Sequence, residues 1–356
     1  KKDIKNILTG IKIFFYHKKH KMKSKNFYGL SDTFIVAEIG NNHEGNFHNA
    51  KKLIDKAAEA KVDAVKFQTF KTENFVSTSI DNERKKKLDK FQLTMKEFTM
   101  LSNYAKKKKL VFFSTPLDIE SCNYLNKIQP IFKISSGDNN YTSLINKILK
   151  FKKPTIISTG MTNLKDLKKL DTLIKNKKFK AKLCFLHCVS SYPATFKELN
   201  LNSISFLKSK FPNYYIGYSD HSTGIEACIN AAALGAKVIE KHFTLSHNFS
   251  NFRDHQLSAN PIEMKEMVRK IRNIAIMKGK VDKKITKTEQ KNQKALRRSL
   301  AANKTLNPGH IIKNYDLIML RPANGFKDED RKLVIGKKVN QIIKKNEIIL
   351  RRKLNW

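Results

Sequence analysis

The chain has 356 residues, enough for one large domain and a small second one. A hydrophobic content of 40% and an aromatic content of 10% exclude wholesale disorder. Basic residues number 71 against 31 acidic ones, a formal net charge of +40, but only ten are arginines, and the lysines are spread over the whole chain. Direct base readers rely on arginine, so we expect solvated helix faces and no specific nucleic-acid partner. A genuine polyanion-binding patch stays the alternative.

The cysteines and the first residues indicate the compartment. The four cysteines form no CxxC pair and are interpreted as small core residues, so we expect a reduced, cytoplasmic protein. The apolar run Ile7–Tyr16 is short and interrupted, and no small-residue cleavage site follows it. This pattern predicts neither a signal peptide nor a membrane partner.

Eight short apolar segments, each closed by Gly, Ser, Thr, Asp or Pro, predict strands. They span 34–40, 64–70, 110–116, 131–137, 154–160, 181–188, 214–220 and 236–244. Segments with helical patterns lie between and after them, at 49–61, 94–108, 118–127, 142–150, 162–176, 200–210, 223–234 and 260–277. This alternation predicts a (β/α)8 TIM barrel. A doubly wound open sheet is disfavoured because no GxGxxG follows the first strand.

The pattern changes after the last of these helices. Residues 278–294 are polar without an apolar period and indicate a linker, and short strand-like pieces follow, punctuated by Gly and Pro. We therefore expect a small, mostly-β domain that packs on another surface. The expected divisions are a basic N-terminal extension (1–30), a barrel domain (31–280), a linker (281–295) and the small domain (296–356).

The carboxyl ends of the eight strands carry polar residues, and this is where a barrel places its active site. His221 and His242 end neighbouring strands, so their side chains can converge. Two imidazoles with an otherwise open shell suit a divalent transition metal. Two satisfied polar residues near the barrel mouth are the alternative interpretation.

Lys66 and Lys133 lie inside otherwise apolar strands and need anionic partners, because a lone buried ammonium is costly. Three interpretations remain open. One is an internal ion pair with Glu38 or Glu240, and another is a Schiff-base lysine. The third is a cradle for phosphate and carboxylate groups, completed by hydroxyls of Thr115, Ser136, Ser190 and Ser219.

Eight motifs, in order and spacing, resemble the sialic acid synthase family. They are AEIGNNHEG, VKFQTF, FFSTPLD, FKISSGD, IISTGM, LHCVSSYP, GYSDHS and EKHFT. The similarity continues through RDHQLSANP (253–261) and covers about 34–356. The tail with its LRPANG resembles the antifreeze-like (SAF) domain that closes these synthases.

The resemblance implies an enzyme that joins phosphoenolpyruvate to the open-chain aldehyde of N-acetylmannosamine or a related N-acetylated amino sugar. Carbon C3 of phosphoenolpyruvate attacks the aldehyde, water adds at C2, and phosphate leaves to give a nine-carbon 2-keto acid such as N-acetylneuraminate. A divalent metal, Mn²⁺ or Mg²⁺, acts as the Lewis acid on the aldehyde oxygen.

Site residues are implied by the same resemblance, position by position. His221 and His242 match the metal ligands, and Glu38 matches an essential carboxylate near the reacting centre, to which we assign proton transfer or orientation of water. Arg321 matches an arginine that the tail inserts into the site of the partner subunit, which implies a domain-swapped homodimer. Positions around phosphoenolpyruvate are matched by Lys66, Thr115, Lys133, Ser136, Ser190 and Ser219. Positions lining the sugar and the metal site are matched by Gln68, Ser158, Tyr192 and Glu240.

One departure bears on the substrate. Ser190 stands where the neuraminic acid synthases carry Asn, so the loop containing it also fits a legionaminic or pseudaminic acid synthase that uses a 2,4-diacetamido hexose. A polyanion- or membrane-surface-binding protein that has lost catalysis is the alternative from a different class, and it rests on the net charge and the tail domain.

Overall fold

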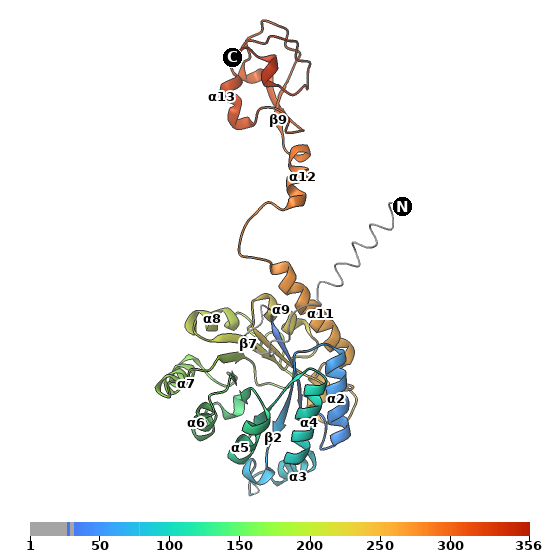
Figure 1. Cartoon of the computed structure of the whole chain (residues 1–356), viewed down its shortest axis with the longest axis vertical. Coiled ribbons are helices and arrows are strands. Elements are labelled where there is room, and N and C mark those ends of the chain that lie inside the picture. Colours follow the sequence, from blue (N-terminus) through green and yellow to red (C-terminus); the bar gives the residue numbers. More distant parts are fainter. Residues whose placement is uncertain (1–26, 29–31, 78) are drawn as a thin grey trace. The chain divides into compact units, whose positions relative to one another are not determined.

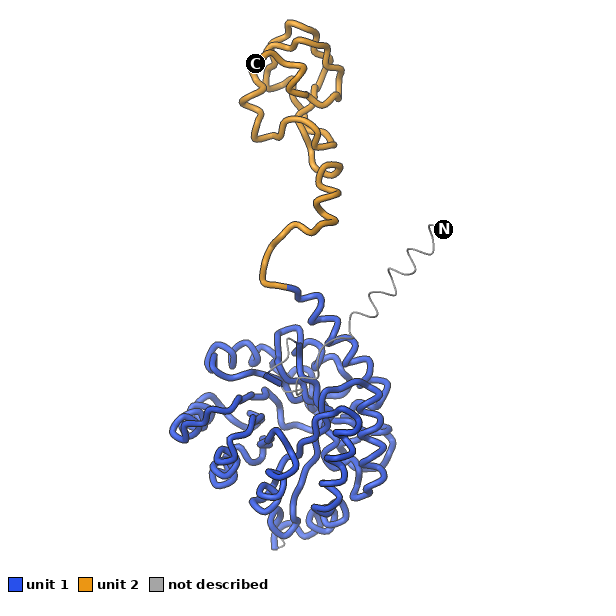
Figure 2. The backbone as a smooth tube through the Cα atoms, in the orientation of Figure 1, with its two compact units in different colours: residues 1–279 blue, residues 280–356 orange. Residues whose placement is uncertain are grey.

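The computed structural model describes residues 27–28, 32–77 and 79–356. The chain divides into two compact units, residues 1–279 and 280–356, which Figure 2 shows in different colours. The predicted basic extension, 1–30, lies outside the described residues except for Phe27 and Tyr28.

Eight parallel strands form one sheet in the order β3-β2-β1-β8-β7-β6-β5-β4. β1 pairs with both β2 and β8, and the two end strands, β3 and β4, contact each other, so the sheet curls into a nearly closed barrel. The predicted TIM barrel is confirmed. The strands are β1 (Phe34–Gly40), β2 (Ala64–Thr69), β3 (Val111–Pro116), β4 (Phe132–Ile134), β5 (Thr155–Ser158), β6 (Leu183–His187), β7 (Tyr215–Asp220) and β8 (Val238–His242).

Helices surround this sheet, as Figure 1 shows. All eight predicted helices are present, and Asn163 caps one of them with its side-chain oxygen. They are α2 (Phe47–Glu59), α4 (Met95–Lys107), α5 (Ile119–Ile128), α6 (Thr142–Lys150), α7 (Leu164–Asn176), α8 (Ser203–Lys210), α9 (Glu226–Ala233) and α11 (Pro261–Lys278).

Two further helices of this unit were not predicted, α3 (Asn82–Phe91) and α10 (Arg253–Leu257). α3 buries only Phe91, so it lacks the apolar period by which an amphipathic helix is recognised. α10 has five residues, too few for a period to show. Short 3-10 turns follow β2 and β4, at Thr72–Asn74 and Ser136–Asp138.

Alternation along the strands divides the barrel interior into two layers, because successive side chains of a strand point to opposite faces. The layer at the amino ends of the strands is apolar and includes Phe34, Val36, Ala64 and Val238, with the fully buried ring of Phe27 packed among them. The next inward positions toward the carboxyl ends are polar. The outward side chains pack against the helices in one large hydrophobic cluster.

The second unit contains one antiparallel pair, β9 (Ser299–Ala302) with β10 (Leu317–Leu320), around its own small core. The helix α12 (Lys287–Leu296) occupies much of the predicted linker 281–295 and was not predicted. No residue of α12 is buried, which explains why its sequence shows no apolar period. The remaining elements are α13 (Arg331–Val334) and the 3-10 turns Asn314–Asp316, Asp328–Asp330 and Arg351–Lys353.

Among the residues that the structure describes, no helix is both long and apolar enough to cross a bilayer.

A buried ion pair on the outer face of the sheet fixes the carboxyl ends of β7 and β8. Lys241 Nζ lies 2.7 Å from Asp220 Oδ2, and both side chains are fully inaccessible to solvent. Asp220 Oδ1 also accepts hydrogen bonds from the hydroxyls of Tyr218, at 2.9 Å, and Ser222, at 2.7 Å. The pair therefore holds the backbone just before His221 in one position.

We expect Asp220→Ala to lower the free energy of unfolding of the barrel by about 3–5 kcal/mol, because it leaves the Lys241 ammonium buried without a counter-charge. Urea unfolding followed by circular dichroism measures the change. Asp89→Ala is the matched control, since it removes an acid from the surface pair with Lys85 and should have a far smaller effect. Equal effects of the two substitutions would contradict the role given to the buried pair.

Candidate active site

Two acidic and two basic side chains meet in the polar layer of the barrel interior, and all four are almost inaccessible to solvent. Lys66 Nζ lies 2.8 Å from Glu38 Oε1 and 3.8 Å from Glu240 Oε1. Lys133 Nζ lies 3.0 Å from the same Glu240 oxygen. We call Glu38, Lys66, Lys133 and Glu240 the charge quartet. The alternative of internal ion pairs, left open from the sequence, is realised for both lysines.

The strand register explains why the quartet forms. Glu38 on β1 stands opposite Lys66 on β2, and Glu240 on β8 stands opposite Ser219 on β7. The hydroxyl of Ser219 donates to Glu240 Oε1 at 2.9 Å, and Lys66 donates to Thr115 Oγ1 at 3.1 Å. Four of the predicted site residues thus lie together with hydroxyl partners that the sequence also singled out.

The two carboxylates of the quartet have opposite pKa shifts. Burial raises the pKa of Glu38 above its ordinary value, against the opposing effect of the Lys66 ammonium. Burial alone would also raise the pKa of Glu240, but the ammonium groups of Lys133 and Lys66 outweigh it and lower the pKa to about 2. Environments that separate two acids in this way are typical of sites where one holds a proton and the other stays charged.

The lysines differ as well. Burial lowers the pKa of Lys66, but the Glu240 and Glu38 carboxylates outweigh burial, and the net pKa is raised. For Lys133 burial prevails, and its pKa is lowered in spite of Glu240. A Schiff-base lysine must attack as a neutral amine. The raised pKa of Lys66 therefore disfavours that interpretation for this residue.

Each carboxylate of the quartet has one oxygen without a hydrogen-bond partner. Glu38 Oε2 and Glu240 Oε2 are buried without a hydrogen-bond partner. Gln68, another predicted residue, places its Nε2 3.4 Å from Glu38 Oε1 and accepts from Asn41 Nδ2 at 3.0 Å. Buried polar atoms without partners are rare in folded proteins, so these two oxygens are candidates for contact with a bound molecule.

The two predicted histidines do converge. The ring centroids of His221 and His242 are 5.5 Å apart, and the ring of Tyr192 lies 4.3 Å from that of His221. His221 Nδ1 is 2.6 Å from the carbonyl oxygen of Val189 and must donate to it, so Nε2 carries the lone pair and accepts from the Tyr192 hydroxyl at 3.1 Å. Burial lowers the pKa of both imidazoles, which favours the neutral form that ligates metals.

His221 and His242 can supply only part of the coordination shell of a divalent metal. In the part of the chain that the structure describes, no group of three or more His, Cys, Asp or Glu side chains converges to hold a metal ion. Two neutral imidazoles are present, and Nδ1 of His242 is buried without a hydrogen-bond partner. The donor set therefore fits an ion only if water and substrate take its remaining positions.

A second polar group surrounds Gly160, just beyond β5. A Cβ added at Gly160 would lie 2.4 Å from Ser190 Oγ, 2.7 Å from Ser136 Oγ and 3.0 Å from Cys188 Sγ. The Gly160 amide donates to Ser136 Oγ at 3.2 Å, and Ser190 Oγ is buried without a partner. We call this the glycine cradle. Ser136 and Ser190 belong to it, whereas Thr115 and Ser219 contact the charge quartet, so the four hydroxyls predicted to ring the lysines form two groups.

Several site residues were missed from the sequence. Asp254 is buried, with Oδ2 3.9 Å from His242 Nδ1 and Oδ1 3.4 Å from Arg253 Nε. Arg253 stacks over the Tyr192 ring at 4.9 Å. Both belong to the motif RDHQLSANP, so the similarity around that motif was the available signal. Cys188, expected to be a plain core residue, borders the glycine cradle.

Two predicted residues remain. Ser158 ends β5 and is buried. Arg321 belongs to the second unit, where its Nε donates to the carbonyl of Leu296 at 2.7 Å. Its predicted role in a partner subunit stays a prediction.

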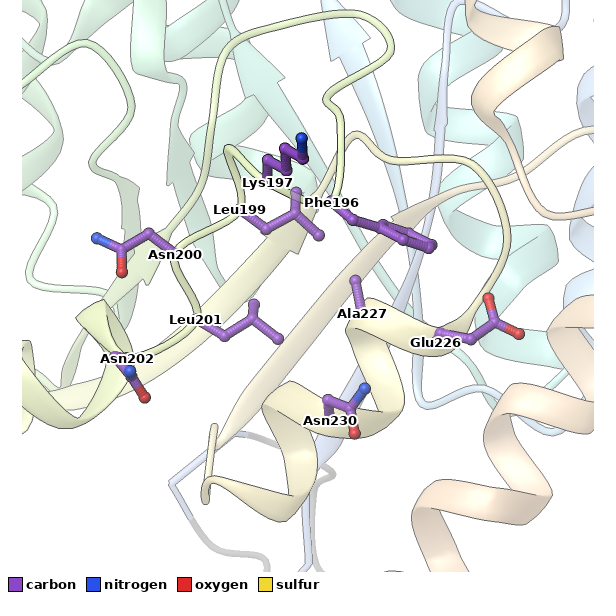
Figure 3. Close-up of a pocket in the computed structure, with 9 residues that line it drawn as sticks. All are labelled: Phe196, Lys197, Leu199, Asn200, Leu201, Asn202, Glu226, Ala227 and Asn230. Carbon is purple, nitrogen blue, oxygen red and sulfur yellow. The ribbon is translucent and has the colours of Figure 1, made fainter.

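A separate hollow of about 410 Å³ lies outside the barrel, between the β6–α8 loop and α9. Figure 3 shows apolar side chains such as Phe196, Leu199 and Leu201 around it, with Glu226 as its one acidic group. It has no paired charges and no histidine, so it is not the candidate active site. The same loop bears Val189 and Tyr192, which hold His221.

Known proteins resemble this chain over most of its length. The model of the NeuB family matches residues 53–283, and that of the SAF domain matches residues 297–354. An N,N'-diacetyllegionaminic acid synthase of Campylobacter jejuni is 40% identical over 90% of this chain and 99% of its own. The N-acetylneuraminate-9-phosphate synthase of Homo sapiens is 31% identical over 90% of this chain and 92% of its own.

Solved structures agree. The N-acetylneuraminic acid synthetase of Leptospira borgpetersenii superposes with a TM-score of 0.69 at 35% identity, over 73% of this chain and 90% of that one. The family model covers more than half of the chain, and these relatives align along the barrel that carries the charge quartet. The chain therefore belongs to the NeuB family and ends in a SAF domain.

Proposed function

We propose that the protein condenses phosphoenolpyruvate with an N-acetylated amino sugar in its open-chain form, releasing phosphate and a nine-carbon 2-keto acid. The observation that carries this is the charge quartet beside the neutral histidine pair, buried at the carboxyl end of a barrel. The relatives named as synthases of sialic, legionaminic and pseudaminic acids support the same reaction class.

Phosphoenolpyruvate brings a carboxylate and a phosphate into a quartet that is already neutral. The positions implied for it are Lys66, Lys133 and the hydroxyls of both groups. The glycine cradle offers the Gly160 backbone, the unpartnered Ser190 hydroxyl and Ser136, a set that suits phosphate or carboxylate oxygens. Since the quartet is balanced, the added negative charge needs a further positive one, which supports a divalent metal at His221 and His242.

A divalent ion held by these histidines would supply Lewis-acid polarisation of the sugar aldehyde. Glu38 is the group assigned to hold or deliver a proton, because burial raises its pKa. Glu240 stays ionised and keeps Lys133 in place. Gln68, Tyr192 and Ser158 would orient the sugar, and the buried surroundings exclude bulk water from the reacting atoms.

Two sugars are candidates for the second substrate. N-acetylmannosamine is the expected substrate, with N-acetylneuraminate as product. A 2,4-diacetamido hexose fits equally, and the 40% identical legionaminic acid synthase favours it as a second candidate. A homodimer in which Arg321 of one copy reaches the site of the other is part of the same proposal, because the second unit has its own small core and an exposed Arg321.

The reaction is tested by phosphate release from phosphoenolpyruvate with a panel of sugars: N-acetylmannosamine, its 6-phosphate and 2,4-diacetamido hexoses. We expect release only when an acetamido sugar and Mn²⁺ or Mg²⁺ are both present, and none after chelation. The product mass identifies the sugar. Release that is unaffected by chelation, or that needs no sugar, would overturn the proposal.

We expect His221→Ala and His242→Ala to lower kcat/KM by at least about 100-fold, since each removes a ligand of the Lewis acid. Calorimetric titration with Mn²⁺ should show the binding of wild type and its loss in both variants. His48→Ala, at an exposed position on α2, is the control and should match wild type in both measurements. Wild-type metal affinity in either site variant rules out the metal assignment.

We expect Gly160→Ala to raise the KM for phosphoenolpyruvate at least about tenfold while the KM for the sugar stays the same, because the added methyl fills the glycine cradle. Gly137→Ala is the matched control, since the nearest atom to a Cβ there is Ser135 Oγ at 3.7 Å. Steady-state kinetics with each substrate varied gives both constants. A change confined to the KM for the sugar would move phosphoenolpyruvate out of the cradle.

A further inference from the structure

Charge is distributed unequally between the two ends of the barrel. The seven connections that lead from a helix into the next strand contain ten lysines and one acidic residue, Asp63. The segments that lead from a strand to the next outer helix, with α3 and α10 included, contain eight lysines or arginines and nine acidic residues. The end opposite the candidate active site is therefore strongly positive. We call it the lysine face.

The lysines of this face concentrate where α6 and α7 end. A hollow of about 580 Å³ lies there, and no acidic side chain is among the residues that line it. Five lysines do line it, and each is exposed to solvent: Lys150, Lys152, Lys177, Lys178 and Lys180. One cation at a helix C-terminus is explained by the helix dipole. The helix dipoles do not explain five lysines around one hollow.

The backbone also favours a positive surface here. Lys152 and Lys178 have φ values of 55° and 47°, in the left-handed region where helices usually end with glycine. Lys61 and Lys109, which follow α2 and α4 at the same end, share this feature with φ values of 63° each. At four helix ends a lysine therefore adopts a left-handed backbone conformation that is unfavourable for residues with a side chain. Each of these lysines adds a positive charge to the lysine face.

The chemistry of this face points to lipid rather than nucleic acid. Its connections carry lysines and no arginine, and Arg272 of α11, which lies at this end, is paired with Asp63. Nucleic-acid surfaces favour arginine forks and exposed aromatic rings. Phe179, the aromatic residue of the hollow, is half-buried against the barrel core. Lysines attract anionic headgroups through their charge alone.

The N-terminal region adds to this. Phe27 is buried in the apolar layer of the barrel interior, so the polypeptide joins the barrel at its lysine-face end. The sequence before it, residues 1–26, contains nine lysines and the apolar run Ile7–Tyr16. Basic residues combined with apolar ones are the composition of segments that associate with membrane surfaces.

We propose that the lysine face binds the surface of an anionic phospholipid bilayer, leaving the candidate active site, at the other end of the barrel, open to its substrates. This goes beyond the proposed enzymatic function and departs from the expectation of no membrane partner. That expectation rested on the short, interrupted apolar run Ile7–Tyr16, whereas the fold gathers lysines that are spread along the sequence.

The test is sedimentation of the full chain with vesicles of phosphatidylcholine alone and of equimolar phosphatidylcholine and phosphatidylglycerol. We expect binding to the anionic vesicles only, and release at about 1 M salt, where charges are screened beyond a few ångströms. The variant K152E/K177E/K178E/K180E should bind at least about 100-fold more weakly. Its phosphate release should equal that of wild type, which shows that it folds and separates this proposal from the enzymatic one.

The matched control is K52E/K96E/K165E/K265E, which makes the same change in net charge at four exposed lysines of the outer helices away from the lysine face. It should keep most of the binding to anionic vesicles. Equal loss in both variants would show a response to net charge alone and overturn the proposal. So would tighter binding of a single-stranded RNA that competes with the vesicles, since the partner would then be a nucleic acid.

Discussion

Burying four charges inside a barrel is the constraint on which the rest of this structure depends. Glu38, Lys66, Lys133 and Glu240 are each almost fully buried, and an unpaired charge in that position would cost several kcal/mol. They come from β1, β2, β4 and β8, so they satisfy one another only when the sheet curls far enough to bring those strands around a common axis. A shift of one residue in any of these strands would turn its charge outward.

The same network gives the site its chemical character. Because Glu240 is shared by two ammonium groups, its pKa falls, while Glu38 with one close lysine keeps a raised pKa. One acid is thereby held ionised and the other can carry a proton, although both are glutamates in the same layer. The histidine pair lies beside the network, neutral because it is buried, and the carbonyl of Val189 fixes the orientation of His221. All of these groups stand on strands or directly after them, where the backbone is rigid.

Two buried charge systems therefore coexist in one barrel. Inside, the charge quartet leaves two carboxylate oxygens without a hydrogen-bond partner. Outside the sheet, Asp220 and Lys241 are fully partnered and face only the core. β8 contributes to both, because alternation sends Glu240 inward and Lys241 outward, and β7 supplies Ser219 to the inner system and Asp220 to the outer one. The two systems therefore differ in their hydrogen-bond partners and not in their burial.

The sequence by itself determined the eight strands, the barrel, the small terminal domain and the residues that ring its mouth, because each strand is a short apolar run with polar residues at its end. It missed α3 and α12, which bury almost nothing and so leave no period. It did not show which anionic groups pair with Lys66 and Lys133. The other lysines are spread along the sequence, so it gave no sign that they meet on one face. Only the tertiary structure decided that Lys66 and Lys133 pair with Glu38 and Glu240, that Ser136 and Ser190 surround Gly160, and that the lysines of the helix ends form one face. These are contacts between residues far apart in sequence, which the closure of the barrel brings together and no local pattern records.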